Sequence, residues 1–546
     1  MADGVGRDWG LGELTEPERR LCAAFARGDV VDLRAGDKEA DDATRGATWA
    51  AERQVRAEVL AALLLSEAAP APGRVPGVYL TGARVVGALN LEFAQVQHPL
   101  RLRGCWFENT LCLDSATLRP VDLSSSVFPQ LSACEATFAG SLRLTGCRAT
   151  KLELLDTQVD GGLTLSRARL SNPGGHALNA DRLAVTGNLF CQNGFTAEGE
   201  VRLLGARIDG QLYLSGARLT NPGGRALNTD GITVHGDAFC QEGFTTKGEV
   251  QLSNARIDGS LVLSSAKLSN PGGYALNADR LAVTGNLFCQ NGFTAEGGVR
   301  IVSGRVDGQV SFSTAKLTNP GGRALDCEGL TAQSLWLSQG FTATGRIDLT
   351  GATVGTLHDS SVSWPTRLAL DEFTYQDLEP DLPAKERLTW LARCGTTYRP
   401  QPYEQLASYY RRQGHDEQAR QVLLAKHRHH RREQPWHARS WGYLLDAMVG
   451  YGFRPARAAS WMLLLWVIGS AVFAHWPALP LKPNESPPFQ PVLYAADLLL
   501  PIINLGQESA FNPTGPGQWL APTLVTLGWI LATAAVTGIT RVLNRS

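Results

Sequence analysis

The chain has 546 residues, with 51 basic and 52 acidic side chains, 57 glycines, 28 prolines and 10 cysteines. This length predicts several domains, and a content of 44% hydrophobic and 19% charged residues excludes a disordered or collagen-like chain. The near-zero net charge argues against a nucleic-acid-binding protein. It conceals one basic segment, because residues 384–457 carry 14 bases against 6 acids.

Residues 1–77 are expected to form an N-terminal helical cap. The first twenty residues contain no apolar run long enough for a secretory signal peptide, so we expect the N-terminus to stay in the cytosol. Residues 50–66 (AAERQVRAEVLAALLLS) have the spacing of an amphipathic helix that ends before Pro70. Such a helix would cover the first edge of the domain that follows.

Residues 78–375 carry two superimposed repeats. The string Asn-Pro-Gly-Gly begins at every 49th residue, starting at Asn172. A finer pattern, Leu-x-Leu-x-x-Ala-x-Leu, places apolar residues five or six positions apart, as in 89–96. This spacing fits neither a helix nor a hairpin sheet. We expect short strands that turn a corner about every five residues and close a square coil, and stacked coils would share one apolar interior.

These pentads resemble those of pentapeptide-repeat proteins, whose fold is a right-handed quadrilateral parallel β-helix. The resemblance covers slightly more than half of the chain and implies a mainly β domain with a leucine-filled interior. Each 49-residue unit within 160–350 would then form two coils. The Asn-Pro-Gly-Gly segments should form loops along one edge, since Pro-Gly suits a turn with positive φ. We expect this edge to be offered to a protein partner. The residues of this edge are Asn172, Pro173, Asn221, Pro222, Asn270, Pro271, Asn319 and Pro320.

The same period should stack charged side chains on the outside and cysteines on the inside. Two charged rows are expected, which we interpret as solvated ladders, and 24 bases against 26 acids in 78–375 argue against DNA mimicry. Successive equivalent cysteines would stand about 10 Å apart, too far for a disulfide, and are expected to be small core residues. The rows are Arg207, Arg256 and Arg305 beside Asp209, Asp258 and Asp307; Arg169, Arg218, Lys267 and Lys316; and Cys191, Cys240 and Cys289.

Residues 384–457 are predicted to form a basic helical hairpin next to a membrane. Residues 402–432 read as two helices joined at Gly414, similar to a single tetratricopeptide-like hairpin, and docking on the last coil is favoured over peptide capture. The run KHRHHRR at 426–432 predicts contact with anionic lipid headgroups, with a solvated helix face as the alternative. The lipid-contacting residues would be Lys426, Arg428, Arg431 and Arg432.

Residues 459–540 are predicted to form a two-helix membrane domain. The stretches 459–476 and 519–540 carry no formal charge and are long enough to cross a core of ~30 Å, with a pair of buried core helices as the alternative. Flanking arginines predict a two-span protein of the plasma membrane with both termini cytoplasmic. The apolar segment 491–506 would be re-entrant or interfacial, and Asp497 would line a pore if the pair acted as a channel.

The order of these segments is similar to a set of actinobacterial proteins labelled membrane-associated oxidoreductases, with 194–210 (GFTAEGEVRLLGARIDG) as its most specific part. That resemblance implies redox activity. However, the sequence contains no recognisable dinucleotide, nucleophile or metal motif, so no catalytic residue, cofactor or metal is predicted. The sequence therefore favours a membrane-anchored, non-catalytic β-helix scaffold for an unidentified protein partner. An oxidoreductase and a two-helix pore are the alternatives, and self-association is left open.

Overall fold

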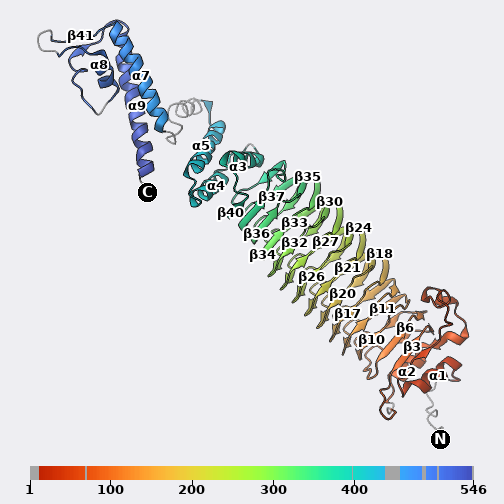
Figure 1. Ribbon diagram of the computed structural model, residues 1–546. Helices are drawn as coiled ribbons and strands as arrows, with labels where there is room; N and C mark the ends of the chain where they lie inside the picture. The colour runs from red at the N-terminus through yellow and green to blue at the C-terminus, as the bar shows by residue number, and fades with distance from the viewer. Residues whose placement is uncertain are drawn as a thin grey trace. The chain divides into compact units, whose positions relative to one another are not determined.

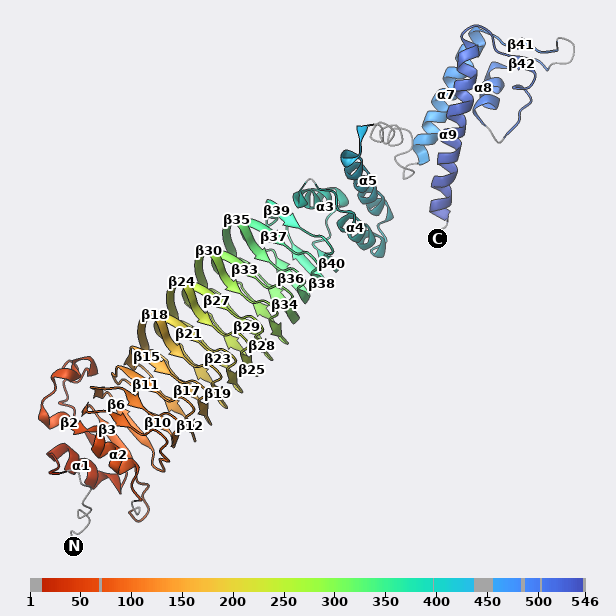
Figure 2. The same ribbon diagram turned by 180° about the vertical axis from the view of Figure 1, so that it is seen from behind.

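The computed structural model describes residues 12–67, 71–395, 397–436, 455–482, 487–500 and 503–543, without the side chains of 455–458 and 534–543. The chain divides into two compact units, Met1–Leu382 with Thr389–Gly395, and Pro383–Leu388 with Thr396–Ser546. The first unit is a mainly β, parallel β-solenoid of about 13 turns, with its strands stacked in successive coils (Figure 1; Figure 2). The β-helix predicted from the pentads is therefore confirmed.

Each coil of the repeat array has four sides. Strands β16 (Gln158–Val159) and β17 (Leu163–Thr164) form the first two sides, and the two arms of β18 (Arg169–Asn179) form the third and fourth. Every side pairs in parallel with the same side of the next coil. Gln158 pairs with Ala184, and Ala184 with Arg207, so two coils take 49 residues. The prediction of two coils per 49-residue unit is confirmed.

The strands follow this order along the whole solenoid. Before the array they are β3 (Val78–Thr81), β4 (Arg84–Val86), β5 (Leu89–Asn90), β6 (Leu100–Arg103), β7 (Trp106–Phe107), β8 (Leu111–Cys112), β9 (Thr117–Leu118), β10 (Val121–Asp122), β11 (Gln130–Ser132), β12 (Thr137–Phe138), β13 (Leu142–Arg143), β14 (Arg148–Ala149) and β15 (Lys151–Glu153). The short strands of the first two sides are then β19 (Ala184–Val185), β20 (Leu189–Phe190), β22 (Arg207–Ile208), β23 (Leu212–Tyr213), β25 (Thr233–Val234), β26 (Ala238–Phe239), β28 (Arg256–Ile257), β29 (Leu261–Val262), β31 (Ala282–Val283) and β32 (Leu287–Phe288), followed by the longer β34 (Arg305–Ser311), β36 (Thr331–Leu337), β38 (Thr353–Asp359) and β40 (Thr374–Glu379). The third and fourth sides are β21 (Thr196–Arg202), β24 (Arg218–Asn228), β27 (Thr245–Gln251), β30 (Lys267–Asn277), β33 (Thr294–Arg300), β35 (Lys316–Asp326), β37 (Thr342–Asp348) and β39 (Arg367–Ala369).

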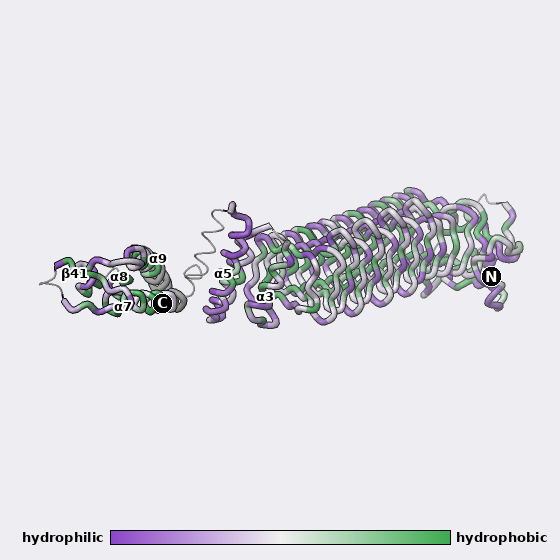
Figure 3. The backbone as a smooth tube through the Cα atoms, turned by 90° about the horizontal axis from the view of Figure 1, so that it is seen from above, coloured by the Kyte–Doolittle hydropathy of each residue, from purple (hydrophilic) through white to green (hydrophobic). Residues whose placement is uncertain are grey.

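The interior is filled by side chains, and at one corner its packing has the same two-coil period as the repeat. At the corner that precedes the third side, a buried alanine in one coil alternates with a buried phenylalanine in the next. A large ring between two small methyl groups fills the corner without a void. Figure 3 shows apolar and polar residues alternating along the coils. The corner residues are Ala168, Phe195, Ala217, Phe244, Ala266, Phe293, Ala315 and Phe341.

The N-terminal end is closed by strands as well as helices. Helix α1 (Glu16–Phe25) precedes β1 (Val31–Asp32), which pairs with β3, and β2 (Gln54–Arg56) pairs with β4. Between them lie the 3-10 turns η1 (Ala43–Thr48) and η2 (Ala51–Arg53), and α2 (Ala57–Leu64) follows. The helix predicted over 50–66 is therefore confirmed only in its second half. The first half pairs with the solenoid instead, because doing so satisfies backbone groups that the edge would expose.

One buried ion pair holds this end together. Glu18 of α1 is fully buried, and its carboxylate accepts hydrogen bonds from both Nε and Nη2 of Arg56, at 2.9 and 2.8 Å. The backbone N–H groups of Thr15 and Arg56 also donate to it. Burial raises the pKa of Glu18, but these bonds lower it by more, to about 2.

At the other end, β39 and β40 form the last coil. The chain continues into α3 (Ala384–Leu391) and the turn η3 (Ala392–Cys394). Trp390 is buried, with its ring 6.5 Å from that of Tyr375 on β40. Arg393 donates to the carbonyl oxygens of Trp364 and Pro365, at 2.6 and 2.8 Å. These contacts cover the end of the apolar interior.

The second unit is helical. Helices α4 (Pro400–Arg412) and α5 (Asp416–Glu433) pack as a hairpin around a turn at Gly414, whose φ of 78° suits glycine. The predicted pair of helices joined at Gly414 is thereby confirmed. Residues 437–454 of the predicted basic segment lie outside the described residues.

The last helices surround a small apolar cluster. Helix α8 (Pro491–Leu499) packs against α7 (Pro455–His475) and α9 (Gly517–Leu543), and β41 (Leu479–Pro480) pairs with β42 (Phe511–Asn512). The cluster contains Phe473, Tyr494, Leu498 and Leu524. Trp466 of α7 also donates its indole N–H to the carbonyl oxygen of Val492 at 3.0 Å.

The predicted membrane domain is wrong. Across the residues that the structure describes, no helix is both long enough and apolar enough to cross a bilayer. Within the described residues, α7 and α9 pack against α8 and bury part of their apolar surface in the cluster between them. This finding overturns the two transmembrane helices over 459–540, the re-entrant segment 491–506 and the plasma-membrane location that followed from them.

Candidate functional site

The Asn-Pro-Gly-Gly segments form ridges along one corner of the solenoid, between the third and fourth sides. In the pairing of β18 with β21, Ser171 lies opposite Glu198 and His176 opposite Glu200, so four residues stand against the single Gly199. The four segments therefore share one edge, and the binding of a partner there stays a prediction. The proline of each ridge is exposed, as in Pro173.

The asparagines hold the ridges in shape. In each ridge the asparagine side-chain amide donates to the carbonyl oxygen four residues later, as from Asn221 to Arg225 at 2.8 Å. The second glycine of the ridge motif packs directly on this amide. These asparagine amides are thus occupied within their own turn, and the exposed residues of the edge include the proline and the first glycine of each ridge. The donors are Asn172, Asn221, Asn270 and Asn319.

A row of positively charged residues starts the third side of the solenoid. Arg148 pairs directly with Arg169 on the next coil, and from there threonines and cations alternate coil by coil. All the cations are exposed. We call this set the cation–threonine row: Arg148, Arg169, Thr196, Arg218, Thr245, Lys267, Thr294, Lys316 and Thr342.

The five cations of this row have no acidic partner within 4.0 Å in the described part of the chain. The other repeated row behaves differently, because each of its arginines pairs with the aspartate two residues later in its own coil. Nε lies 2.9 Å from the carboxylate in Arg207–Asp209 and Arg256–Asp258, and 2.8 Å in Arg305–Asp307. The expected solvated ladder thus describes the Arg207–Asp209 type of row, in which each charge is neutralised, better than it describes the cation–threonine row.

The first two cations of the row carry an energetic cost. Arg148 and Arg169 stand directly opposite each other on adjacent strands. Neighbouring strands lie about 4.8 Å apart, and like charges directly opposite one another destabilise a sheet. Glu198, on the next coil, accepts a hydrogen bond from Ser171 at 2.5 Å rather than pairing with either arginine. A bound anion would remove this repulsion.

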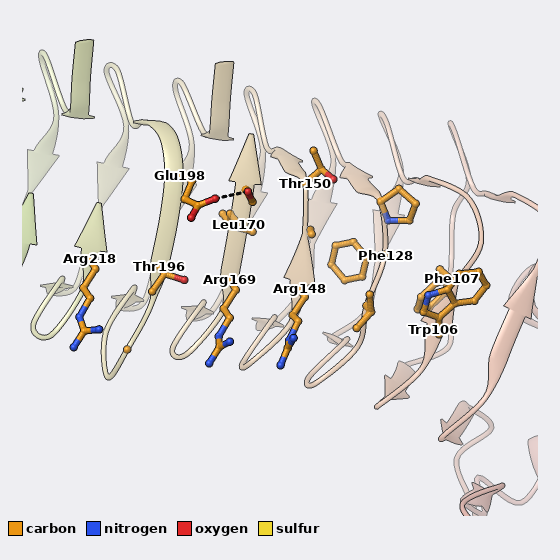
Figure 4. A pocket seen from close by; sticks show the side chains of 15 residues that line it. Trp106, Phe107, Phe128, Arg148, Thr150, Arg169, Leu170, Thr196, Glu198 and Arg218 are labelled. Atoms are coloured by element: carbon orange, nitrogen blue, oxygen red, sulfur yellow. Dashed lines mark hydrogen bonds between the residues drawn. The ribbon is translucent and has the colours of Figure 1, made fainter. Parts of the chain in front are cut away.

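A groove of about 920 Å³ lies over the N-terminal part of the row. Trp106, Val127 and Phe128 form its apolar end, and Arg148, Arg169 and Arg218 continue it along the coils. Figure 4 shows the three guanidinium groups projecting side by side in one direction, away from Glu198. Arginine guanidinium groups arranged in this way suit carboxylate or phosphate oxygens, to which they donate paired hydrogen bonds.

The interior offers no comparable space, because its inward positions are occupied by buried apolar side chains. Cys191, Cys240 and Cys289 are buried free thiols, as predicted for small core residues. Burial raises the pKa of Cys191 and Cys240 to about 12, so neither is a thiolate at neutral pH. Among the described residues, no group of His, Cys, Asp and Glu is arranged to hold a metal ion.

Asp497, the predicted pore residue, lies in the second unit and is 4% exposed. Its carboxylate accepts hydrogen bonds from the backbone N–H groups of Leu505, Gln507 and Glu508, at 2.6, 2.8 and 2.7 Å. Three such bonds occupy both carboxylate oxygens. The side chain therefore positions the segment after α8.

The predicted lipid-contacting residues lie on α5. Lys426 contacts Glu404 of α4 through an ion pair, and Arg431 is 9% exposed. Lys426 is thus engaged within the hairpin, and Arg431 is buried. Arg428 and Arg432 lie on the same helix, and contact of this run with lipid stays a prediction.

Sequence reasoning found four of the five cations but missed Arg148 and the threonines between them. Arg148 lies outside the 49-residue period, because it belongs to the coil before the array, where it pairs with Arg169 of the next coil. The available signal is local: each member of the row from Arg169 to Thr342 directly follows the alternating alanine or phenylalanine of the corner, as in Phe195-Thr196 and Ala217-Arg218.

The fold and this groove define the chain as a β-solenoid with a basic outer face. No family model, curated protein or solved structure matches it.

Proposed function

We propose that the chain is a non-catalytic scaffold whose solenoid binds a protein partner along the cation–threonine row. The observation that carries this proposal is the contrast between the two charged rows. One repeat unit supplies both, yet only the Arg207–Asp209 type is neutralised by its own coil. A row that only kept the surface soluble would not need to place Arg148 directly opposite Arg169 without an acidic partner, because like charges directly opposite one another destabilise a sheet.

The repeat itself supports a binding role. Stacked coils place equivalent side chains at a constant spacing, so a linear partner meets the same contact several times. Each exposed ion pair contributes only about 0–1 kcal/mol, but contacts made together along one partner reinforce one another. A filled interior leaves the outer faces as the surface available for recognition.

Site-specific photocrosslinking in cells that make the full chain tests the proposal. A photoreactive residue replaces Thr245, which lies between Arg218 and Lys267 on adjacent coils. The matched control replaces Thr233, which lies between Arg207 and Arg256 on the first side. We expect a protease-sensitive adduct from position 245 that is weaker or absent from position 233.

Two results would contradict the scaffold function. One is the absence of any polypeptide adduct from either position in the folded chain. The other is an adduct that forms equally at both positions and persists when Arg218 and Lys267 are changed to glutamate. The redox activity implied by resemblance stays a prediction, since no observation on the described residues favours it. The pore depended on the membrane spans and is not retained.

A further inference from the structure

The cation–threonine row has a repeat distance that limits what can bind along it. Adjacent coils are separated by about 4.8 Å, so cations on every second coil recur at about 9.6 Å. From Arg169 to Lys316 the row extends over six coil steps, or about 29 Å. A partner that neutralises it must present one negative charge per 9.6 Å or so, always on the same face.

Among regular polypeptide conformations, polyproline II matches this distance best. It has three residues per turn and a rise of about 3.1 Å, so every third side chain recurs on one face at about 9.3 Å. A β-strand advances about 10 Å in three residues, but its side chains alternate, so the third residue points to the opposite face. In an α-helix a side chain returns to the same face after seven residues, at about 10.5 Å. Its mismatch with the spacing of the cations therefore grows about three times faster along the row than the mismatch of polyproline II.

We infer that the row is the docking site for an acidic segment of a protein partner in the polyproline II conformation, with Asp or Glu at every third position. The inference rests on the proposed scaffold function and names the chemistry of its partner. Successive carboxylates would lie over Arg169, Arg218, Lys267 and Lys316. The intervening threonine hydroxyl groups, on the coils between the cations, lie within the same row and can donate to the carbonyl groups of the segment, which polyproline II leaves unpaired.

The apolar end of the groove supports this choice of partner. Trp106 is partly exposed there, beside Val127 on the next coil and Phe128. Proline-rich segments in this conformation dock in aromatic-lined grooves, where their preformed helix loses little entropy on binding. The charge density also argues for a peptide, because B-form DNA carries one charge per about 1.7 Å, far more than the row offers.

Fluorescence anisotropy with the purified full chain tests the inference. The probe is a labelled peptide of Glu-Pro-Pro repeats about fifteen residues long. The control peptide has the same composition, but the step from one glutamate to the next alternates between two and four positions. We expect the regular peptide to bind about tenfold more tightly than the control. Exchange of Arg169 and Arg218 for glutamate should abolish this preference, whereas Arg207→Glu with Arg256→Glu, which alters the neutralised row, should leave it intact.

Each other outcome overturns the inference. Equal affinity for both peptides would mean that the row reads net charge without spacing. A single-stranded oligonucleotide of matched length that competes more strongly than the regular peptide would assign the groove to nucleic acid. A helical peptide with glutamate at every seventh residue that binds better would assign it to an α-helix. Crosslinking of a polypeptide at position 245 together with failure of the regular peptide would reject this inference and leave the scaffold function standing. Circular dichroism of each variant checks that the solenoid is intact.

Discussion

A single methyl group at Gly248 should destabilise the solenoid far more than one at Gly223, although both glycines belong to the same ridge region. Gly248 lies in the coil after the ridge at Asn221, and its φ is +119°. A Cβ atom there would lie 2.4 Å from the carbonyl oxygen of Asn221 and 2.9 Å from that of Gly224. Gly223, at the tip of the ridge, has a φ of +75°, and a Cβ atom added to it would meet no other atom within 4 Å.

The expected magnitudes follow from these contacts. Gly223→Ala pays only for left-handed backbone, about 1–2 kcal/mol. Gly248→Ala adds a collision with two backbone oxygens, which cannot rotate away as a side chain would. Backbone strain of about 1–3 kcal/mol and overpacking of about 1–3 kcal/mol together predict a loss near 4 kcal/mol. Gly297 has the same φ and equivalent contacts, so Gly297→Ala should behave like Gly248→Ala.

Urea denaturation of the full chain, followed by the β-sheet signal in circular dichroism, measures both losses from the midpoint and slope. Equal losses for Gly248→Ala and Gly223→Ala would refute the reasoning, because the two sites would then differ in nothing but backbone strain. A loss at Gly223 larger than at Gly248 would show that the ridge tip, rather than the coil beneath it, supports the corner.

Three further predictions concern groups inside and at the end of the solenoid. Because the pKa of Glu18 falls from 4.5 to about 2 on folding, its ionised form stabilises the cap above pH 4.5 by about 3 kcal/mol. This stability should be lost as the pH falls towards 2. In Glu18→Gln, urea denaturation should show an unfolding free energy that depends less on pH across that range. Cys191 should react with maleimide only after unfolding, as mass spectrometry would detect, because burial raises its pKa to about 12. Tyr213→Ala should lower the unfolding free energy by about 1–3 kcal/mol, since the ring stacks between Phe190 and Phe239 at 4.9 and 5.2 Å.

Each of these predictions has its own control. Tyr213→Phe keeps the stack, so a loss as large as that of Tyr213→Ala would point to the hydroxyl contact with Gln211 instead. Wild-type stability that does not change between pH 4.5 and 2 would contradict the assignment to Glu18. Rapid labelling of Cys191 in the folded chain would mean that the interior opens readily.

The architecture of the solenoid could be read from local spacing because each coil repeats one simple requirement. An apolar side chain must point inward at every side, and a corner must follow within a few residues. The pattern at 89–96 meets that requirement in every pentad, and the ridge glycine of each Asn-Pro-Gly-Gly string adopts the positive φ that the motif predicts. The alternation of alanine and phenylalanine at one corner is likewise written in the chain, and it has the same two-coil period as the ridges.

The ends of the chain were harder to interpret because one pattern suits several environments. Residues 50–66 have helical spacing throughout, yet Val55 pairs with Val85 in a strand because an open sheet edge is available beside it. The apolar stretches near the C-terminus meet a length rule for membrane spans, whereas the structure packs α7 and α9 around α8. Hydrophobicity alone does not distinguish a lipid-facing surface from one that faces another helix.

The sequence by itself determined the coil, its two-coil period and the positions of the ridges, since these depend on residues close together in the chain. Only the tertiary structure decided which charges are neutralised. Arg207 pairs with an aspartate in its own coil, whereas Arg169 lies opposite Arg148 of the coil before and has no acidic group within 4.0 Å. The difference, measured as the presence or absence of an acidic group within 4.0 Å, depends on the direction of each side chain and on its neighbours across the stack. No linear period records these, and they mark the face on which we place the partner.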